Sequence, residues 1–125
     1  IGEGKHFCAG GDVKTLSLKG RNSILRKDFF FSEYKLNYQI SNFCKPYLSL
    51  WNGVVMGGGI GLSLYGDYRI VTDPTKLAMP ETAIGFFPDV GGSYFLSRIK
   101  NNYGIFLGLT GHVINSYEIL TLGLG

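Results

Sequence analysis

Runs that predict short strands alternate with runs that predict helices along this chain, and this alternation limits the folds that it can adopt. Four extended runs lie between turn-forming residues, over residues 47–51, 54–56, 68–72 and 76–79. Helices are expected over residues 25–43, 60–65, 91–99 and 103–109, with a last helix from Ser116 that has Glu118 in its first turn. Such alternation is typical of α/β architecture with crossover connections. The sequence therefore predicts an α/β domain.

The first part of the chain is expected to lead into a glycine loop. Residues 1–12 predict the end of a strand, after which Gly10 and Gly11 free the backbone and Asp12 caps or fixes the turn. Residues 13–20 are short and basic, and residues 20–23 predict a turn. The helix over residues 25–43 carries an aromatic stripe, which we expect to pack in the core and not to bind a cofactor.

The composition is that of one folded domain, with 45% hydrophobic residues in a chain of 125. The net charge is only +3, and no nucleic-acid-reading motif is present, so no nucleic-acid partner is expected. Much of the excess charge lies in five residues, Lys14, Lys19, Arg21, Arg26 and Lys27. This group is either a solvated face or a contact for a polyanionic ligand that enters by the first loop. No apolar run has the length of a membrane-spanning helix, so no membrane partner is expected.

Two carboxylates stand in apolar, glycine-bounded surroundings in the segment MPETAIGFFPDVGG, residues 79–92. Glu81 follows Pro80, and Asp89 follows Pro88 and precedes two glycines. Apolar surroundings disfavour the charged form of a carboxyl group, so the pKa is expected to rise toward values suited to acid and base catalysis. The alternative is a pair of turn residues, with Glu81 in the first turn of a helix and Asp89 as a cap.

Three consecutive glycines, Gly57, Gly58 and Gly59, precede the helix expected over residues 60–65. Unshielded amides at such a helix start favour a developing oxyanion or a phosphate. Neither GxGxxG nor GxxxxGK[ST] fits this stretch, so the oxyanion interpretation gains on the phosphate one. Close packing of a strand against a helix remains the structural alternative, as a surface turn does for the first loop.

Other residue types offer weaker candidates. No GxSxG motif is present, which argues against a Ser/His/Asp triad. His6 and His112 are too few and too isolated to predict a metal site, and neither Cys8 nor Cys44 belongs to a CxxC pair. Cys8 is expected to be a buried small side chain beside the first loop.

Four motifs taken together, HFCAGGD, VVMGGGIGLS, AMPETAIGFFPDVGGSYFLSR and LGLTGHVINS, resemble the enoyl-CoA hydratase/isomerase (crotonase) superfamily. Within it the sequence is most similar to the 3-hydroxyisobutyryl-CoA hydrolases. The resemblance covers essentially the whole chain and implies the crotonase-like ββα superhelix of the ClpP/crotonase fold. Because the catalytic domain of this family is longer, residues 1–125 are expected to be the central part of one domain, with its N- and C-terminal portions missing. Such a segment alone is expected to be poorly stable, because much apolar surface would be uncovered.

The resemblance also implies roles for individual residues. Gly11 and Gly58 match the positions whose amides form the oxyanion hole, and Glu81 and Asp89 match the two acidic catalytic residues of the hydrolases. Gly61, grouped with the substrate-binding positions, stands where hydratases of the superfamily carry their first acid, which favours hydrolysis over alkene hydration. Glu81 then attacks the thioester or activates water, while Asp89 handles protons and the substrate hydroxyl.

Coenzyme A is expected as part of the substrate, with no separate cofactor and no metal. By resemblance it bends around the first loop, so that Cys8, Ala9 and Gly10 meet its adenine end and Lys14 meets phosphate.

The implied reaction is hydrolysis of 3-hydroxyisobutyryl-CoA in valine catabolism. The alternatives are an enoyl-CoA hydratase or isomerase and a non-catalytic acyl-CoA-binding subunit. Members of this type are often mitochondrial and allow a homo-oligomer; since the chain begins at Ile1, its natural start is expected to be missing.

Overall fold

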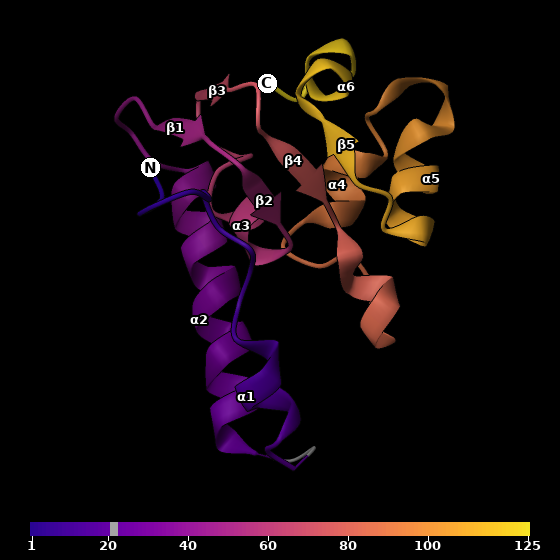
Figure 1. Cartoon of the computed structure of the whole chain (residues 1–125). Coiled ribbons are helices and arrows are strands. Elements are labelled where there is room, and N and C mark those ends of the chain that lie inside the picture. Colours follow the sequence, from indigo (N-terminus) through magenta and orange to yellow (C-terminus); the bar gives the residue numbers. More distant parts are fainter. Residues whose placement is uncertain (21–22) are drawn as a thin grey trace.

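The computed structural model describes residues 1–20 and 23–125 (Figure 1). Its elements in chain order are α1 (Val13–Ser17), α2 (Ile24–Ser41), β1 (Leu48–Trp51), β2 (Val54–Met56), α3 (Gly58–Gly61), β3 (Tyr68–Val71), β4 (Lys76–Ala78), η1 (Pro80–Ile84), α4 (Gly92–Leu96), η2 (Lys100–Asn102), α5 (Tyr103–Thr110), β5 (Ile114–Asn115) and α6 (Ser116–Thr121). The elements η1 and η2 are 3-10 helices. The turn predicted over residues 20–23 falls partly outside the described residues, and Arg21 of the basic group lies outside them.

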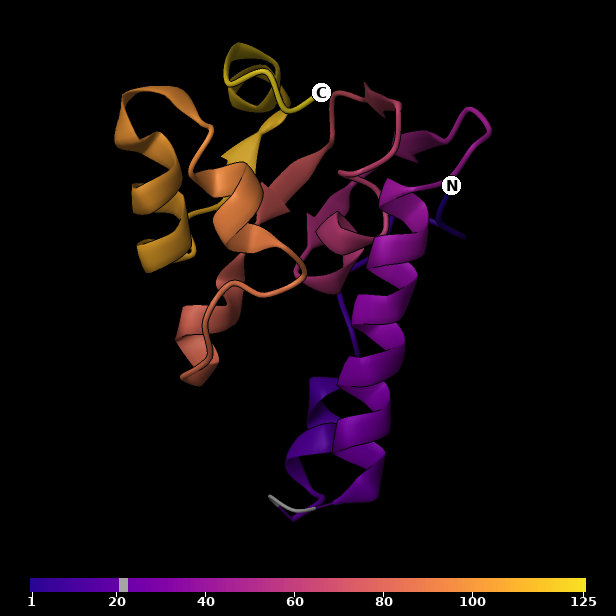
Figure 2. The same ribbon diagram turned by 180° about the vertical axis from the view of Figure 1, so that it is seen from behind.

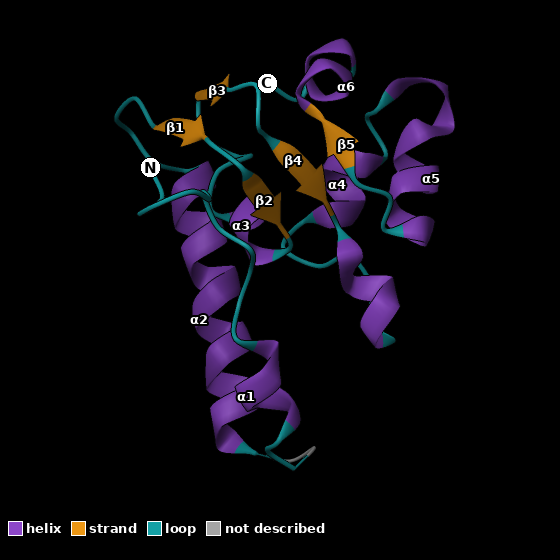
Figure 3. Cartoon of the chain, in the orientation of Figure 1, coloured by secondary structure: helices purple, strands orange, loops and turns teal. Residues whose placement is uncertain are grey.

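The strands of the described residues form two small sheets (Figure 3). β1 pairs with β3 and β2 pairs with β4, both in parallel, and β5 adds to β4 in antiparallel orientation. Parallel partners need a crossover connection, and the connection of each parallel pair contains α3. The predicted α/β architecture with crossover connections is therefore confirmed. β5 was not predicted because two residues are too short to show an alternating pattern.

The glycine-rich helix differs from its predicted range of 60–65. α3 begins at Gly58 and ends at Gly61, and residues 62–65 form turns. Gly57 has φ 52° and ψ −123°, a conformation open mainly to glycine, so the chain turns from β2 into the helix at once. The Ser63 hydroxyl donates to the Gly59 carbonyl oxygen at 2.8 Å, and such back-bonding competes with regular helix geometry.

The first segment forms a loop and not the end of a strand. Cys8 makes a single parallel bridge with Val55. The basic stretch that follows contains α1, which sequence analysis did not anticipate. Asp12 caps α1 by accepting hydrogen bonds from the Thr15 amide at 3.0 Å and the Thr15 hydroxyl at 2.7 Å. The capping role expected of Asp12 is confirmed.

The hydrophobic core lies between the sheets and the later helices. Its fully buried side chains include Trp51, Val55, Ile60, Ile114 and Ile119. Four of these come from strands or helices that were predicted from the sequence. Burial of this apolar surface holds α3 and α6 against the sheets.

The long helix α2 has nearly its predicted range, but its aromatic stripe does not pack in the core. Of the aromatic residues in the stripe, Tyr38 is 70% exposed and Tyr34 is 40% exposed, and the buried residues of the helix are Asn37 and Ile40. Figure 2 shows α2 running past the sheets toward α1, away from the C-terminal helices. The prediction of core packing for the stripe is wrong because most of this helix extends beyond the core that it would have covered.

The C-terminal helices follow their predicted ranges closely. Gly111 ends α5 with φ 64°, the left-handed conformation that glycine favours. α6 begins with a capping box in which Asn115 and Glu118 exchange hydrogen bonds. Among residues 1–20 and 23–125, none of the helices combines the length and the apolar character needed to cross a membrane.

Candidate active site

Two glycine loops lie side by side at the start of α3. The Cys8 amide donates to the Val54 carbonyl oxygen at 3.1 Å, and the Met56 amide donates to the Cys8 carbonyl oxygen at 3.0 Å. A Cβ at Gly10 would lie 3.4 Å from the Gly58 nitrogen, and a Cβ at Gly58 would lie 3.5 Å from the Gly11 nitrogen. The fold thus brings together the two backbone positions that sequence analysis selected.

The amides of Gly11 and Gly58 are available to a ligand. Neither N–H donates a hydrogen bond to another described residue. Gly58 is the first residue of α3, whose N–H has no partner within the helix. Two such amides in neighbouring loops are placed to donate hydrogen bonds to a carbonyl oxygen that becomes negative during a reaction.

Glu81 is buried beside the second glycine loop. It lies in the first turn of η1 after Pro80, as the structural alternative expected, but its side chain is only 7% exposed. Its Oε1 is 3.0 Å from the point where a Cβ at Gly57 would lie, and its Oε2 has no hydrogen-bond partner in the part of the chain that the structure describes. Burial, together with the charges of Asp89 and Glu33, raises the pKa of Glu81 to about 7. The predicted rise in this pKa is confirmed.

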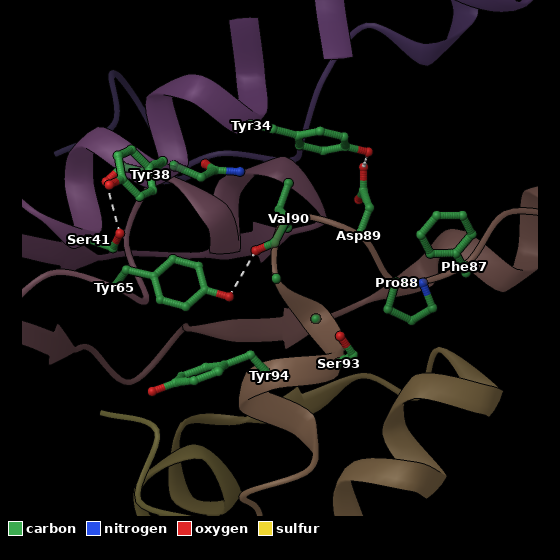
Figure 4. A pocket seen from close by; sticks show the side chains of 13 residues that line it. Tyr34, Tyr38, Ser41, Tyr65, Phe87, Pro88, Asp89, Val90, Ser93 and Tyr94 are labelled. Carbon is green, nitrogen blue, oxygen red and sulfur yellow. Dashed lines mark hydrogen bonds between the residues drawn. The ribbon is translucent and has the colours of Figure 1, made fainter. Parts of the chain in front are cut away.

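Asp89 lies on the loop between η1 and α4 and is held by a residue of α2. The Tyr34 hydroxyl donates a hydrogen bond of 2.7 Å to Asp89 Oδ2 (Figure 4). The alternative role of Asp89 as a side-chain cap does not hold, because the N-cap of α4 is Gly91, which has no side chain to cap the helix. The following residue, Val90, has φ 42°, a strained value for a β-branched residue. Such strain is common at functional sites.

A cavity of about 770 Å³ opens beside Asp89 (Figure 4). Residues of α2 form one wall and the segment from Phe87 to Tyr94 forms another. Tyr34, Tyr38, Tyr65 and Tyr94 all line it, so phenol groups meet apolar surface within one cavity. A cavity of this size is within the range of small-molecule sites.

Glu33 is a third carboxylate of the site, and sequence analysis missed it. A Cβ at Gly58 would lie 2.5 Å from Glu33 Oε1, so this side chain covers the second glycine loop. Burial first, and then the charge of Asp89, raises the pKa of Glu33. The sequence held no signal for it beyond a position on a helix, because no proline or glycine marks it out.

Gly61 lies apart from the paired amides, in the buried last turn of α3. A Cβ there would lie 2.7 Å from Val90 Cβ and 2.9 Å from Asn37 Oδ1. The Asn37 side chain is 93% buried, and neither its oxygen nor its nitrogen has a hydrogen-bond partner among the described residues. The missing side chain at Gly61 therefore makes room for this amide, which is a second polar group that sequence analysis did not find.

The residues expected to meet coenzyme A surround the first loop. Cys8 is a half-buried free thiol, and Ala9 is exposed. Gly10 has φ 99°, so the loop depends on glycine there. Lys14 lies exposed on α1, directly after the loop. Because Ala9 and Lys14 are exposed, a ligand can reach the first loop where it leads into α1.

An α/β fold with paired glycine loops beside a buried carboxylate, that of Glu81, is the arrangement found in a class of acyl-CoA enzymes. The model of the enoyl-CoA hydratase/isomerase family matches residues 1–125, and the chain belongs to this family. The predicted family and its crotonase-like α/β fold are confirmed.

Individual relatives place the chain more closely. It is 47% identical over 121 residues to 3-hydroxyisobutyryl-CoA hydrolase, mitochondrial, of Danio rerio, with 96% of this chain covered. It is 49% identical over 125 residues to 3-hydroxyisobutyryl-CoA hydrolase 1 of Arabidopsis thaliana, with 98% covered. The alignments take in 32% and 33% of these two proteins, so the chain spans about a third of the length of these curated relatives.

Solved structures agree on the fold and carry different names. A carnitinyl-CoA dehydratase from Mycobacterium thermoresistibile has a TM-score of 0.90 and 44% identity, covering 99% of this chain and 37% of that one. An enoyl-CoA hydratase from Rhodobacter sphaeroides has a TM-score of 0.90 and 40% identity, covering 97% and 36%. Since one fold hosts several reactions, the site and not the fold must decide between them.

Proposed function

We propose that this chain belongs to a thioesterase that hydrolyses 3-hydroxyisobutyryl-CoA to 3-hydroxyisobutyrate and coenzyme A. The observation that carries the proposal is the buried Glu81 beside the backbone amides of Gly11 and Gly58, which have no hydrogen-bond partner among the described residues. The names of the relatives from Danio rerio and Arabidopsis thaliana support this substrate.

The amides of Gly11 and Gly58 polarise the thioester carbonyl and stabilise the negative oxygen of the tetrahedral intermediate. Removing one such donor in an enzyme typically lowers kcat by ~10²–10³-fold. Donors on the main chain suit this task because they are fixed before the substrate binds. The loops that carry them are tied to each other through Cys8 and Met56.

Glu81 acts on the polarised carbonyl in its ionised form. It attacks the carbonyl carbon to give an acyl-enzyme anhydride, or it removes a proton from the water that attacks instead. In both routes the carbon–sulfur bond breaks and the thiolate of coenzyme A leaves and takes up a proton. In the first route water then hydrolyses the anhydride, which releases the acid and frees Glu81. A pKa of about 7 lets Glu81 exist in both protonation states near neutral pH. Asp89 transfers protons during the reaction and contacts the hydroxyl group of the substrate.

Coenzyme A would bind across the first loop, with Cys8, Ala9 and Gly10 at its adenine end and Lys14 at a phosphate. The exposure of Ala9 and Lys14 supports this assignment. The mitochondrion is the proposed compartment, on the names of vertebrate relatives such as that of Danio rerio. A homo-oligomer stays a prediction.

The second candidate is an enoyl-CoA hydratase, which the name of the Rhodobacter sphaeroides structure favours. Gly61 argues against it, because the buried position beside Asn37 and Val90 has no space for a catalytic acid. One experiment separates the two reactions: purified protein is given 3-hydroxyisobutyryl-CoA or an enoyl-CoA, and free thiol and enoyl absorbance are followed. Thiol release from the hydroxyacyl ester supports the proposal. Loss of enoyl absorbance without thiol release would make the protein a hydratase, and binding without turnover would make it an acyl-CoA-binding subunit.

A further inference from the structure

Asp89 receives one side-chain hydrogen bond in the described structure, and the donor comes from a distant element. Tyr34 stands 55 residues earlier in the chain, in the middle of α2. Its hydroxyl reaches Asp89 Oδ2 at 2.7 Å, a short hydrogen bond of the kind formed with charged acceptors (Figure 4). Asp89 Oδ1 is left without a protein donor among the described residues.

Aromatic contacts hold Tyr34 in place over the loop that carries Asp89. The ring centroid of Phe30 lies 5.9 Å from that of Tyr34 and 5.7 Å from that of Phe86. Phe86 in turn lies 4.5 Å from Phe87. These distances are typical of interacting aromatic pairs. The row therefore joins α2 to the loop and fixes the distance that the Tyr34 hydroxyl must span.

We propose that Tyr34 is a positioning residue that holds the Asp89 carboxylate in one orientation and leaves Oδ1 free to meet the substrate. This inference rests on the proposed function, in which Asp89 handles the proton and the substrate hydroxyl. A carboxylate on a loop can rotate about its side-chain bonds, and a fixed donor on one oxygen removes that freedom. Tyr34 acts through Asp89 and touches no reacting atom.

The phenol remains a donor throughout the working pH range. Burial first, and then the hydrogen bond to Asp89 and the charges of Asp89 and Glu33, raise the pKa of Tyr34 well above its ordinary value. A phenol that keeps its proton can offer only a donor toward Asp89. The direction of the hydrogen bond is therefore settled by the surroundings of Tyr34.

The test is the variant Tyr34→Phe in the purified protein, which removes one oxygen atom and keeps the ring. Since a hydrogen bond to a charged group contributes more than a neutral one, kcat for thiol release is expected to fall about 10-fold. KM is expected to change less than about 2-fold, because Tyr34 contributes orientation and not binding. The matched control is Tyr117→Phe on α6, a residue that is 77% exposed and lies outside the cavity beside Asp89. The kcat of this control is expected to be about 10-fold higher than the kcat of Tyr34→Phe.

A double-mutant cycle with Asp89→Asn shows whether Tyr34 works through Asp89. In the Asp89→Asn background, Tyr34→Phe is expected to lower kcat less than about 2-fold, because the carboxylate that it positions is gone. An equal fold decrease in kcat in both backgrounds would overturn the positioning role. An increase in KM with kcat unchanged would overturn it as well. Where Asp89→Asn is too slow to measure, the separate changes in kcat and KM of Tyr34→Phe, compared with those of Tyr117→Phe, decide.

Activity of the parent protein distinguishes failure of the positioning role from failure of the proposed thioesterase function. Parent protein that releases thiol while Tyr34→Phe matches it in kcat refutes the positioning role and leaves the thioesterase proposal standing. Parent protein that releases no thiol from 3-hydroxyisobutyryl-CoA refutes both.

Discussion

Replacing Glu81 with Gln should remove activity and at the same time raise stability at neutral and alkaline pH. The pKa of Glu81 is raised from 4.5 to about 7, so the folded protein binds this proton more tightly than the unfolded chain does. The resulting stabilisation is complete below the unfolded value of 4.5 and is lost as the pH rises through about 7. Above that pH the buried charge destabilises the fold by about 3 kcal/mol, an order-of-magnitude figure obtained from 1.36 kcal/mol for each pKa unit.

Gln has nearly the same shape as Glu and carries no charge at any of these pH values. The difference in free energy of unfolding between Glu81→Gln and the parent should therefore be near zero at about pH 4.5 and approach 3 kcal/mol in favour of the variant at about pH 8. Urea denaturation at several pH values measures this difference. Glu3→Gln, which removes an exposed carboxylate, is the matched control and should follow the parent.

Activity gives the second half of this prediction. Thiol release should be abolished in Glu81→Gln, whereas binding of coenzyme A should persist, because the residues expected to meet coenzyme A lie around the first loop. A stability difference that stays constant with pH would refute the burial argument. Unchanged turnover would rule out the proposed role of Glu81.

Three further substitutions test other parts of the fold. Gly58→Ala places a methyl group against the carboxylate over the second loop and should lower kcat by ~10²-fold in the thiol-release assay, whereas Gly20→Ala, in open space, should leave kcat unchanged. Gly61→Glu should not create hydratase activity, and it should reduce the free energy of unfolding by ~1–3 kcal/mol in urea denaturation, because the new side chain meets Asn37. Gain of enoyl-CoA hydration would contradict this, since it would show that the site has space for the acid. Asn115→Ala removes half of the capping box of α6 and should reduce the free energy of unfolding by ~1 kcal/mol with kcat unchanged, and an unaltered urea midpoint would contradict this.

The parts of the site that the sequence could predict are those set by local backbone chemistry. Glycine clusters after predicted strands indicated the two loops, and proline and glycine next to Glu81 and Asp89 marked the acidic segment. The predicted ranges of β1 to β4, α2 and α5 followed from periodicity and were close to those of the structure, whereas α3 begins and ends earlier than predicted. These signals are local, so they can be recognised without knowing how distant parts of the chain pack.

The parts that could not be predicted depend on how α2 packs. Glu33, Tyr34 and Asn37 lie within little more than one turn of that helix, among many other polar and aromatic residues. Which of them face Gly58, Asp89 and Gly61 is decided by the angle at which the helix crosses the loops. For the same reason the aromatic stripe was wrongly assigned to the core, since an apolar side chain on a helix does not indicate where the helix ends relative to its neighbours.

The hydrogen bonds that join the two glycine loops connect peptide groups, through Cys8, Val54 and Met56. Side-chain changes at these three positions therefore leave the bonds in place, and the spacing of the loops is insulated from much of the variation that mutation introduces. The carboxylates of Glu33 and Glu81, by contrast, are side-chain groups, so a single substitution removes either of them. A scaffold with this division is well suited to directed evolution: libraries confined to the acidic positions can explore new reactions on coenzyme A esters while the main-chain frame is inherited unchanged.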